Sequence, residues 1–454
     1  MLGRHRKRTR RAAGRTVAGV SAAAVLAVVL PAPNAGAAEA ATGPTNSITD
    51  VAGIEVGQYT DRTNVTGTSV LLMKEGAQVG VDVRGGVPGT VNTDALNPVT
   101  SQSAFHGLVL SGGSWAGLSA YDGVVQYLRE QKVGHVYADG KTLPGVAGAI
   151  IYDLEQGADF AGQLEVTPDR KFGYEAAKAA KSGPVEQGSV GAGTGAGTDG
   201  PGIRLKGGVG TASVNLGNGI TVASFVVVNS FGKAYDETRG CELYSLHLEV
   251  GNEFGDTRRP PEGCKATVPS AKPADKPSAE VDKNTTIGVV ATNAKLTAPQ
   301  VQKLAQVAHG GLARAIRPAH TMSDGDTIFG VSTKKGSEVG LEDFNALLEA
   351  GANTFSRAVA HAVLRAKPVA GRPTYCQTFP GACAGNTPAN APAEGAEQIG
   401  LAAPAPPAGG EGGGGASLLS VAAPALLVLL GFGALASLRP LRRLVSGRAV
   451  RSPS

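Results

Sequence analysis

The chain has 454 residues and a formal net charge of +5, and 17% of its residues are charged. A basic leader without acidic residues, 1–15, carries the excess of positive charge, so the remainder of the chain is close to neutral. Proteins that bind nucleic acid concentrate Lys and Arg on the surface that meets the phosphates, and a charge confined to the leader argues against nucleic acid as a partner.

Residues 1–37 predict an export signal. The basic stretch is followed by an apolar run, VAGVSAAAVLAVVLPA, and then by the small-x-small site AGA at 35–37, which suits cleavage before Ala38. The alternative, a permanent membrane anchor, is less favoured because the apolar run is short and is broken by Pro31 and Pro33.

Beyond the leader, short apolar runs alternate with amphipathic segments. Strands are predicted, in chain order, at residues 68–73, 79–83, 107–111, 147–153, 220–229, 286–292 and 327–333. Helices are predicted at residues 115–131, 174–182, 298–316 and 341–366. Strands that are apolar on both faces need helices on both sides, so the pattern predicts a layered α/β fold.

The segment at 109–123 has the order of a nucleophile elbow. Its sequence, VLSGGSWAGLSAYDG, predicts a strand, a Gly-rich turn with Ser114 at its tip, and a helix. The elbow motif is G-x-S-x-G, and Ala116 stands in place of the second glycine. Ser114 is a candidate nucleophile, and the alternative is a tight turn in which the serine caps the helix. The downstream histidines that could serve it are His247, His309, His320 and His361.

The glycine-rich segment at 188–202, GSVGAGTGAGTDGPG, has spacings similar to those of a dinucleotide-binding loop. Such a loop needs a strand before it and a helix after it, whereas an extended segment follows here. We therefore reject dinucleotide binding and interpret the segment as a flexible or substrate-lining loop. The sequence predicts no cofactor.

The four cysteines allow three disulfide pairings, of which nearest-neighbour pairing closes the smallest loops. Zinc binding is the alternative, but neither neighbouring pair has the short C-x-x-C type of spacing found in zinc sites. Two disulfides suit an exported protein. The four residues are Cys241, Cys264, Cys376 and Cys383.

A candidate nucleophile of a second kind is Thr285. A Pro- and Lys-rich segment, 267–283, is followed at once by Asn284, Thr285, Thr286 and an apolar run. If the chain is cut before Thr285, the new α-amino group, with a reference pKa of about 7.7–8.0, can take the proton of the threonine hydroxyl. The alternatives are a plain junction of loop and strand, or an Asn-x-Thr glycosylation sequon.

The C-terminal part of the chain predicts a membrane anchor. A cysteine loop at 371–385 is followed by a Pro/Gly-rich spacer at 386–416 and by residues 417–438, which carry no charge. About 20 apolar residues span a bilayer as a helix, and the arginines of 439–454 place the tail in the cytoplasm. The sequence therefore predicts an exported, extracytoplasmic protein tethered to the membrane, with a buried core helix as the alternative.

Several sequence blocks are more informative together than singly. In chain order they are NSITDVAGIEVGQYTD, RGGVPGTVNTDALNP, LVLSGGSWAGLSAYDGV, PGVAGAIIYDL, GSVGAGTGA, KGGVGTAS, VVVNSFG, NTTIGVVATNA and HTMSDGDT. Their content and order resemble the self-cleaving L-aminopeptidase/D-esterase family, also called the β-peptidyl aminopeptidase family. The resemblance covers residues 46–366.

The resemblance implies an N-terminal-nucleophile-like, four-layer α/β/β/α sandwich formed by two chains, 38–284 and 285–370, cut from one precursor. By position, Thr285 matches the nucleophile at the cleavage site, Asn229 matches the asparagine that helps to hold the oxyanion, and Tyr152 matches a tyrosine near the active centre. It further implies that no metal ion or organic cofactor is required and that the cut units assemble as homo-oligomers.

Two registers are open for the segment from Ser323 to Asp326. Some members of the family have a serine followed by Gly and Glu near the nucleophile. Alignment on Gly325 puts Asp324 in place of the serine and Asp326 in place of the glutamate, whereas alignment on Ser323 leaves the acid one residue out of step. We prefer the glycine register, in which Asp326 orients the amine of the nucleophile. A polar turn before the next strand is the alternative.

The predicted function is that of a self-processing hydrolase. It cuts itself between Asn284 and Thr285, and Thr285 then attacks a small peptide, amide or ester substrate through an acyl-enzyme. One rival is a serine esterase of the α/β-hydrolase type with Ser114 as nucleophile; otherwise the segment around Ser114 is interpreted as a pocket wall. The other rival is a non-catalytic surface binding protein on the same scaffold.

Overall fold

The structure is a computed structural model that describes residues 41–100, 104–154, 166–198, 203–267 and 284–383. These residues all belong to one unit, within Met1–Ala393. Several predicted segments lie outside the described residues, namely 1–37, nearly all of 267–283, 386–416, 417–438 and 439–454.

A continuous path of strand pairing runs through the described residues in the order β10-β11-β14-β15-β2-β4-β7-β3, and β1 also pairs with β2. The strands are β1 (Glu55–Asp61), β2 (Thr66–Val83), β3 (Thr90–Val91), β4 (Phe105–Ser111), β7 (Val146–Ile150), β10 (Gly208–Asn215), β11 (Thr221–Asn229), β14 (Thr285–Thr292) and β15 (Thr327–Ser332). Shorter pairs are β5 (His135–Val136) with β6 (Thr142–Leu143), β8 (Gly197–Thr198) with β9 (Leu205–Lys206), and β12 (Tyr235–Asp236) with β13 (Glu242–Leu243).

The long strand β2 belongs to two sheet layers. Its first part, 68–72, pairs antiparallel with β1 and β4, and its last part, 78–83, pairs antiparallel with β15. The pairing is irregular after Leu72, and such bulges bend a strand. The strands predicted at 68–73 and 79–83 are therefore one bent strand that passes from one layer to the other.

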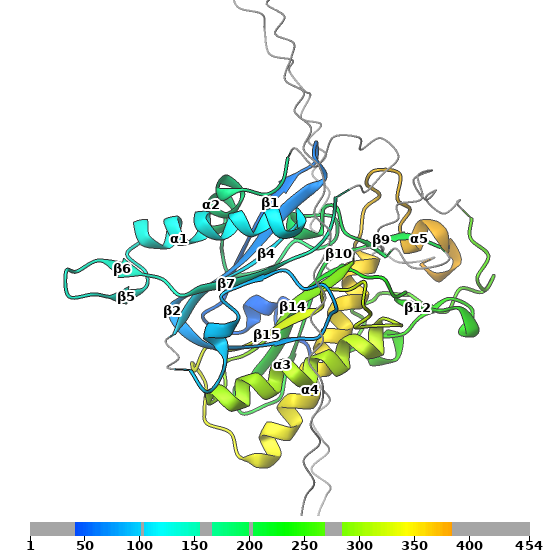
Figure 1. The fold of residues 1–454 in the computed structure, drawn as a ribbon. Helices are drawn as coiled ribbons and strands as arrows, with labels where there is room; N and C mark the ends of the chain where they lie inside the picture. Colours follow the sequence, from blue (N-terminus) through cyan, green and yellow to red (C-terminus); the bar gives the residue numbers. More distant parts are fainter. Residues whose placement is uncertain (1–40, 101–103, 155–165, 199–202, 268–283, 384–454) are drawn as a thin grey trace, which may run out of the picture. The chain divides into compact units, whose positions relative to one another are not determined.

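Helices cover both outer faces of this double sheet. α1 (Ala120–Glu130) and α2 (Arg170–Lys178) lie on one side, and α3 (Ala298–Ala315) and α4 (Leu341–Leu364) lie on the other (Figure 1). One apolar cluster joins α3 and α4 to one face of β10, β11 and β14, a second fills the space between the sheets, and a third joins α1 and α2 to β2 and β4. The order of layers is α/β/β/α, as expected.

Strand β11 shows why the sequence forms this arrangement. Val226 and Val228 pack with α3 and α4, whereas Phe225 and Val227 pack into the space between the sheets. Because successive side chains of a strand point to opposite faces, a strand that is apolar throughout must be covered on both sides. The same reasoning from the sequence predicted the layered fold.

The predicted helices are confirmed, with shifted ends. The helix predicted at 115–131 begins as an α-helix only at Ala120, after a turn of 3-10 helix. The helix predicted at 174–182 begins earlier, at Arg170, because the side chain of Asp169 accepts two backbone N–H groups of the first turn. Strands β1 and β10 escaped prediction because Gly, Ser, Thr and other polar residues interrupt their apolar positions.

The last described segment packs onto the α3–α4 side. Tyr375, from α5 (Tyr375–Thr378), and Phe379 are fully buried and share a cluster with Tyr235. Disulfides join Cys241 to Cys264 and Cys376 to Cys383. The described part of the cysteine loop at 371–385 therefore packs against the domain.

The predicted location at a membrane requires correction. No helix among the residues that the structure describes is long and apolar enough to cross a membrane. The segment expected to do so, 417–438, lies outside those residues. The prediction of an anchored, extracytoplasmic protein with the membrane as a partner is therefore withdrawn.

A buried ion cluster fastens a loop of the first predicted chain to α4. Glu253 accepts hydrogen bonds from Arg357 Nε and, at 2.7 Å, from Arg357 Nη2, and its Oε2 lies 2.9 Å from His361 Nε2. All three side chains are at most 4% exposed. Burial opposes ionisation of Glu253, but hydrogen bonds from His361 and Arg357 outweigh it and lower the pKa of Glu253 to about 2.

We expect Glu253→Gln to lower the free energy of unfolding by roughly 3–5 kcal/mol, because it leaves Arg357 buried without a counter-charge. Urea unfolding measures this loss. Since the pKa of Glu253 is lowered from 4.5 to about 2 on folding, its contribution is complete above pH 4.5 and is lost as the pH falls towards 2.

The control is Glu237→Gln, which breaks an exposed ion pair with Lys233. That change should cost less than about 1 kcal/mol. Equal losses of unfolding free energy in the two variants would contradict the larger contribution of the buried cluster to stability.

Candidate active site

Thr285 lies at one end of the sheet, where several neighbouring strands begin or end. It is the first residue of β14, and Asn229, the last residue of β11, is its antiparallel partner. Because β15 runs parallel to β14, the loop that precedes β15, with Ser323 to Asp326, reaches the same end of the sheet. Thr285 and Asn229 are 2% and 0% exposed. The sheet topology thus brings together candidate residues that are distant in sequence.

Backbone hydrogen bonds hold the peptide bond between Asn284 and Thr285 against this loop. The N–H of Asn284 donates to the carbonyl of Ser323 at 2.7 Å, and the carbonyl of Asn284 accepts from the N–H of Gly325 at 3.0 Å. The Thr285 hydroxyl donates to the same carbonyl oxygen. Ser323 therefore contributes its main chain, and the hydroxyl of Thr285 lies directly beside the bond expected to be cut.

The loop is packed so closely that only glycine fits at position 325. A Cβ there would lie 2.7 Å from Thr285 Oγ1 and 2.7 Å from the carbonyl oxygen of Val87. Val87 belongs to the RGGVPG turn after β2, and its N–H donates to the carbonyl of Asp324 at 2.9 Å. This turn therefore lies close to Thr285.

Two buried carboxyl groups flank Gly325. Asp326 accepts the N–H of Thr286 at 2.8 Å on one oxygen and bonds to His320 on the other. Asp324 accepts the backbone N–H of Phe231 at 3.0 Å and, on its other oxygen, the N–H and the hydroxyl of Thr321 at 3.3 and 2.5 Å. Burial, and then the charge of Asp326, raise the pKa of Asp324 to about 6. The pair can therefore take up a proton in mildly acidic solution.

The amide of Asn229 is oriented by two hydrogen bonds. Its Oδ1 accepts the N–H of Gly197 at 2.9 Å, and its Nδ2 donates to the backbone carbonyl of Tyr152 at 2.7 Å. Tyr152 thus holds Asn229 through its main chain. An amide nitrogen has two N–H groups, so the second can donate to a negatively charged oxygen formed beside Thr285.

Lys206, which was not predicted from the sequence as a site residue, orders the glycine-rich loop. Its side chain is fully buried, and Nζ donates to the backbone carbonyls of Gly193, Ala196 and Gly207 at 2.8, 2.6 and 3.0 Å. The residue after Ala196 binds Asn229. The described part of the glycine-rich segment therefore contacts Asn229 through Gly197. The one sequence signal for Lys206 was its place in the KGGVGTAS block.

Ser114 lies on a strained turn. Its φ of 52° is in the left-handed region that disfavours non-glycine residues. The turn is held by buried Asp153, another residue missed from the sequence, which accepts the N–H of Gly113 at 2.7 Å. Burial raises the pKa of Asp153 to about 6. Within the described residues no hydrogen bond joins the Ser114 hydroxyl to a histidine.

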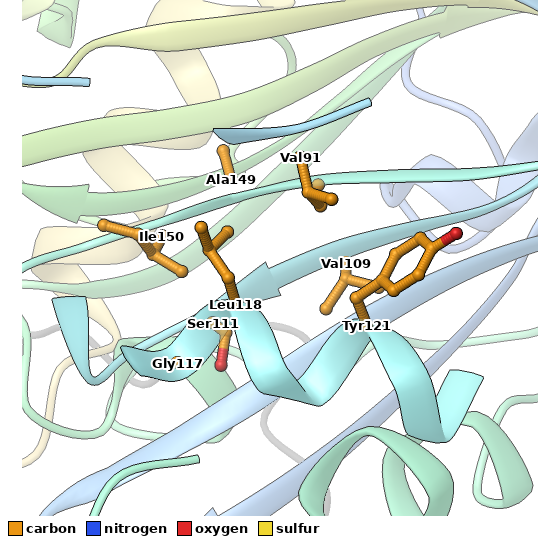
Figure 2. A pocket seen from close by; sticks show the side chains of 9 residues that line it. Val91, Val109, Ser111, Gly117, Leu118, Tyr121, Ala149 and Ile150 are labelled. Atoms are coloured by element: carbon orange, nitrogen blue, oxygen red, sulfur yellow. The ribbon is translucent and has the colours of Figure 1, made fainter. Parts of the chain in front are cut away.

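The pocket drawn in Figure 2 is separate from the polar groups around Thr285 and Asn229. It lies beside η3 (Ser114–Ser119) and α1 and is lined by Val91, Val109, Ser111, Gly117, Leu118, Tyr121, Gly148, Ala149 and Ile150. It contains neither Thr285 nor Asn229, so the candidate site is defined by its polar geometry and not by this cavity. Across the described ranges, no group of three or more His, Cys, Asp or Glu side chains is placed to hold a metal ion.

Comparison with known proteins identifies the family. The pattern of peptidase family S58 matches residues 46–376. The chain belongs to this family. An uncharacterised aminopeptidase of Mycobacterium leprae is 40% identical over 366 residues, covering 75% of this chain and 96% of that protein. A 6-aminohexanoate-oligomer endohydrolase of Kocuria sp. is 30% identical over 295 residues, covering 63% of this chain and 74% of that protein.

Solved structures of similar fold include two aminopeptidases. A β-aminopeptidase of Burkholderia sp. has a TM-score of 0.54 at 22% identity, covering 76% of this chain and 95% of that chain. The second is the L-aminopeptidase D-Ala-esterase/amidase of Ochrobactrum anthropi, which is described as a variant of the Ntn hydrolase fold. It has a TM-score of 0.52 at 21% identity, covering 73% of this chain and 89% of that chain. These likenesses show that the S58 chain has the N-terminal-nucleophile hydrolase fold. Its membership of peptidase family S58, with a relative named as an aminopeptidase, makes it a hydrolase that acts as an aminopeptidase.

We expect Gly325→Ala to reduce hydrolysis of an aminoacyl p-nitroanilide by about a hundredfold, because the new methyl group displaces Thr285 Oγ1 or the RGGVPG turn. Steady-state rates of the purified chain measure the effect. The matched control is Gly340→Ala, where a Cβ would meet nothing within 4 Å. Rates within a few-fold of each other in the two variants would contradict the close packing at position 325.

Proposed function

We propose that this S58 chain cuts itself between Asn284 and Thr285 and that the freed Thr285 is the nucleophile of the aminopeptidase. The observation that carries the proposal is the placement of the Thr285 hydroxyl on the carbonyl oxygen of Asn284, at the start of a fully buried strand. A threonine is a weak nucleophile until a base lies beside it, and cleavage at this bond would supply its own amine as that base.

The proposed self-cleavage is an N-to-O acyl shift, in which the acyl group of Asn284 moves from the nitrogen to Oγ1 of Thr285. Oγ1 of Thr285 attacks the carbonyl carbon of Asn284, the C–N bond breaks, and the proton of the hydroxyl passes to the departing nitrogen. The N–H of Gly325, 3.0 Å from the carbonyl oxygen, supports the negative charge that develops there. Water then hydrolyses the ester and leaves a carboxylate on Asn284 and a free amine on Thr285.

Turnover uses the same atoms on a substrate. The amine of Thr285, with a reference pKa of about 7.7–8.0, accepts the proton of the hydroxyl while Oγ1 attacks the substrate carbonyl. The free N–H of the Asn229 amide stabilises the oxyanion. The amine returns the proton to the leaving group, and water releases the acyl group from Thr285.

The aspartates act on the position and charge of the amine. Asp326 already binds the next N–H of the strand, that of Thr286, at 2.8 Å, and is assigned to orient the amine of Thr285. Asp324 is fixed by Thr321 and faces the charge of Asp326. It is assigned to take up a proton in mild acid, because burial and the charge of Asp326 raise its pKa to about 6.

The proposed substrate is a small peptide, amide or ester with a free amino group. The names of the relatives and of the similar structures denote aminopeptidases, an esterase/amidase and an endohydrolase of 6-aminohexanoate oligomers. What these activities share is the cleavage of an amide or ester bond. This supports the broad substrate class.

Intact mass and N-terminal sequencing of the purified chain test the proposal. We expect two chains, the second beginning TTIGVV, and an uncut, inactive product from Thr285→Ala. Thr285→Ser, which keeps the hydroxyl, should still be cut and retain activity. Each disulfide lies within one expected fragment, so the two pieces should separate under denaturation without reductant.

A single intact chain that hydrolyses esters would overturn this mechanism. If activity were then lost in Ser114→Ala while the chain stayed whole, the serine-esterase alternative would replace it. An intact chain without activity towards amides and esters would favour a non-catalytic binding protein.

We expect Asn229→Ala to lower kcat by about 10²–10³-fold with a smaller change in KM, because the amide acts on the oxyanion and not on the bound substrate. The measurement is steady-state kinetics on the cut fraction of each preparation. The control is Asn353→Ala, which removes only an exposed hydrogen bond from Arg314. A fall in kcat of less than threefold for Asn229→Ala would argue against its role.

A further inference from the structure

A histidine connects one of the buried aspartates to solvent. The backbone N–H and the ring Nδ1 of His320 lie 2.9 and 2.8 Å from the same oxygen of Asp326. The other oxygen of Asp326 accepts the N–H of Thr286, next to the proposed nucleophile. The side chain of His320 is 21% exposed, whereas that of Asp326 is 2% exposed. Asp326 therefore lies between β14, towards the interior, and His320, towards solvent.

The position of this histidine is enforced by its surroundings. Its φ of 60° lies in the left-handed region, where a side chain other than glycine is uncommon and marks a site worth explaining. Its ring contacts the ring of His309, from α3, edge to face at 4.8 Å between centroids. The backbone conformation and the ring contact together hold the imidazole against Asp326.

Hydrogen-bond chemistry fixes where the protons lie. A carboxylate only accepts, so Nδ1 of His320 carries a hydrogen when it bonds to Asp326. Nε2 of His309 lies 2.9 Å from the carbonyl oxygen of Asp82, which also only accepts, so His309 carries its hydrogen on Nε2. Burial lowers the pKa of His309 to about 4, and His309 is therefore a neutral packing partner at neutral pH.

The remaining charged groups nearby are paired with other residues. Asp82 forms an ion pair with Arg84 at 2.6 Å on the far side of His309. Arg317, earlier on the same loop as His320, lies over the ring of Tyr244. Of the residues around Asp326, His320 is therefore the one with an ionisable ring that directly contacts its carboxylate.

We propose that His320 is a positioning residue of the active site, whose backbone N–H and imidazole N–H hold the Asp326 carboxyl group aligned with the N–H of Thr286, next to Thr285. The inference rests on the proposed function, in which Thr285 is the nucleophile and Asp326 orients its amine. Three N–H groups point at Asp326, one from Thr286 and two from His320. Such donors stabilise the ionised form of a carboxyl group.

The test compares His320→Ala with His320→Asn in the full-length chain. The asparagine amide can replace the Nδ1–H donor but does not titrate, whereas alanine removes the donor. We expect the acid limb of the pH profile of kcat/KM, measured with an aminoacyl p-nitroanilide, to move by about one to two pH units towards higher pH in the alanine variant. The asparagine variant should keep the limb within about half a unit of wild type. His247→Ala, which removes an exposed imidazole on η7 (Leu246–Leu248), is the control and should leave the limb unchanged.

A merely structural role for His320 predicts a different result. It would lower kcat/KM by the same factor at every pH and leave the acid limb in place, and that outcome overturns the proposal. If the alanine chain stays uncut, the asparagine variant still tests the donor role. It must keep the wild-type limb, and a displacement of a full unit or more contradicts the donor role.

The same preparations separate this inference from the function on which it rests. Mass analysis of the wild type and of Thr285→Ala shows whether Thr285 is the self-made nucleophile. If the wild type is cut and active while the limb of His320→Ala does not move, the role of His320 fails and the proposed function stands. If the wild type is never cut, the proposed function fails first.

Discussion

The antiparallel pairing of β11 with β14 is the constraint on which the candidate site depends. It sets the last residue of β11, Asn229, opposite the first residue of β14, Thr285. The parallel pairing of β14 with β15 brings the loop before β15 to the same end of the sheet, and the antiparallel pairing of β15 with β2 brings the RGGVPG turn there as well. One end of one sheet layer thus collects every group of the proposed mechanism, and the long apolar runs of these strands hold it in place.

The site combines buried polar groups with closely packed glycines. Asp324, Asp326, Asp153 and Lys206 are all buried, and burial of an ionisable group is costly unless hydrogen bonds compensate it. The three aspartates accept hydrogen bonds from backbone N–H groups, a hydroxyl or His320, and Lys206 donates three hydrogen bonds to backbone carbonyls. Glycine at position 325 lets the main chain approach the Thr285 hydroxyl closely, and Gly85 in the turn after β2 packs against the backbone of Asp324 and Asp326. The polar groups are therefore fixed before any substrate arrives.

The choice of threonine fits the place where it stands. A β-branched residue favours a strand and has few side-chain rotamers, so Thr285 both begins β14 and has a restricted hydroxyl. The similar enzyme of Ochrobactrum anthropi is described as a prototype of the serine aminopeptidases. In the proposed mechanism the methyl group that Thr285 has and a serine lacks restricts the χ1 rotamers that can place Oγ1. The close contact with Gly325 restricts them further.

The sequence by itself determined the positions of most strands and helices, since hydrophobic periodicity is a local property. It also gave the family, through blocks that keep their order, and with the family came Thr285, Asn229 and the aspartates as candidates. It did not reveal β1 and β10, whose apolar positions are interrupted by polar residues and glycine. The export and membrane segments were read from composition, and the structure gives no support to the anchored location.

Only the tertiary structure decided which side chains act together. Lys206, Asp153 and His320 carry no local pattern that marks a role, because a single ionisable residue looks the same in sequence whether it faces water or a buried carbonyl. Their partners lie in other loops and are brought near by strand pairing across the sheet. For the same reason Ser114, which has the better local motif, has no hydrogen bond from its hydroxyl to a histidine among the described residues, whereas Thr285 lies among hydrogen-bonding groups. Spacing along a chain does not set distances in space; the register of the paired strands does.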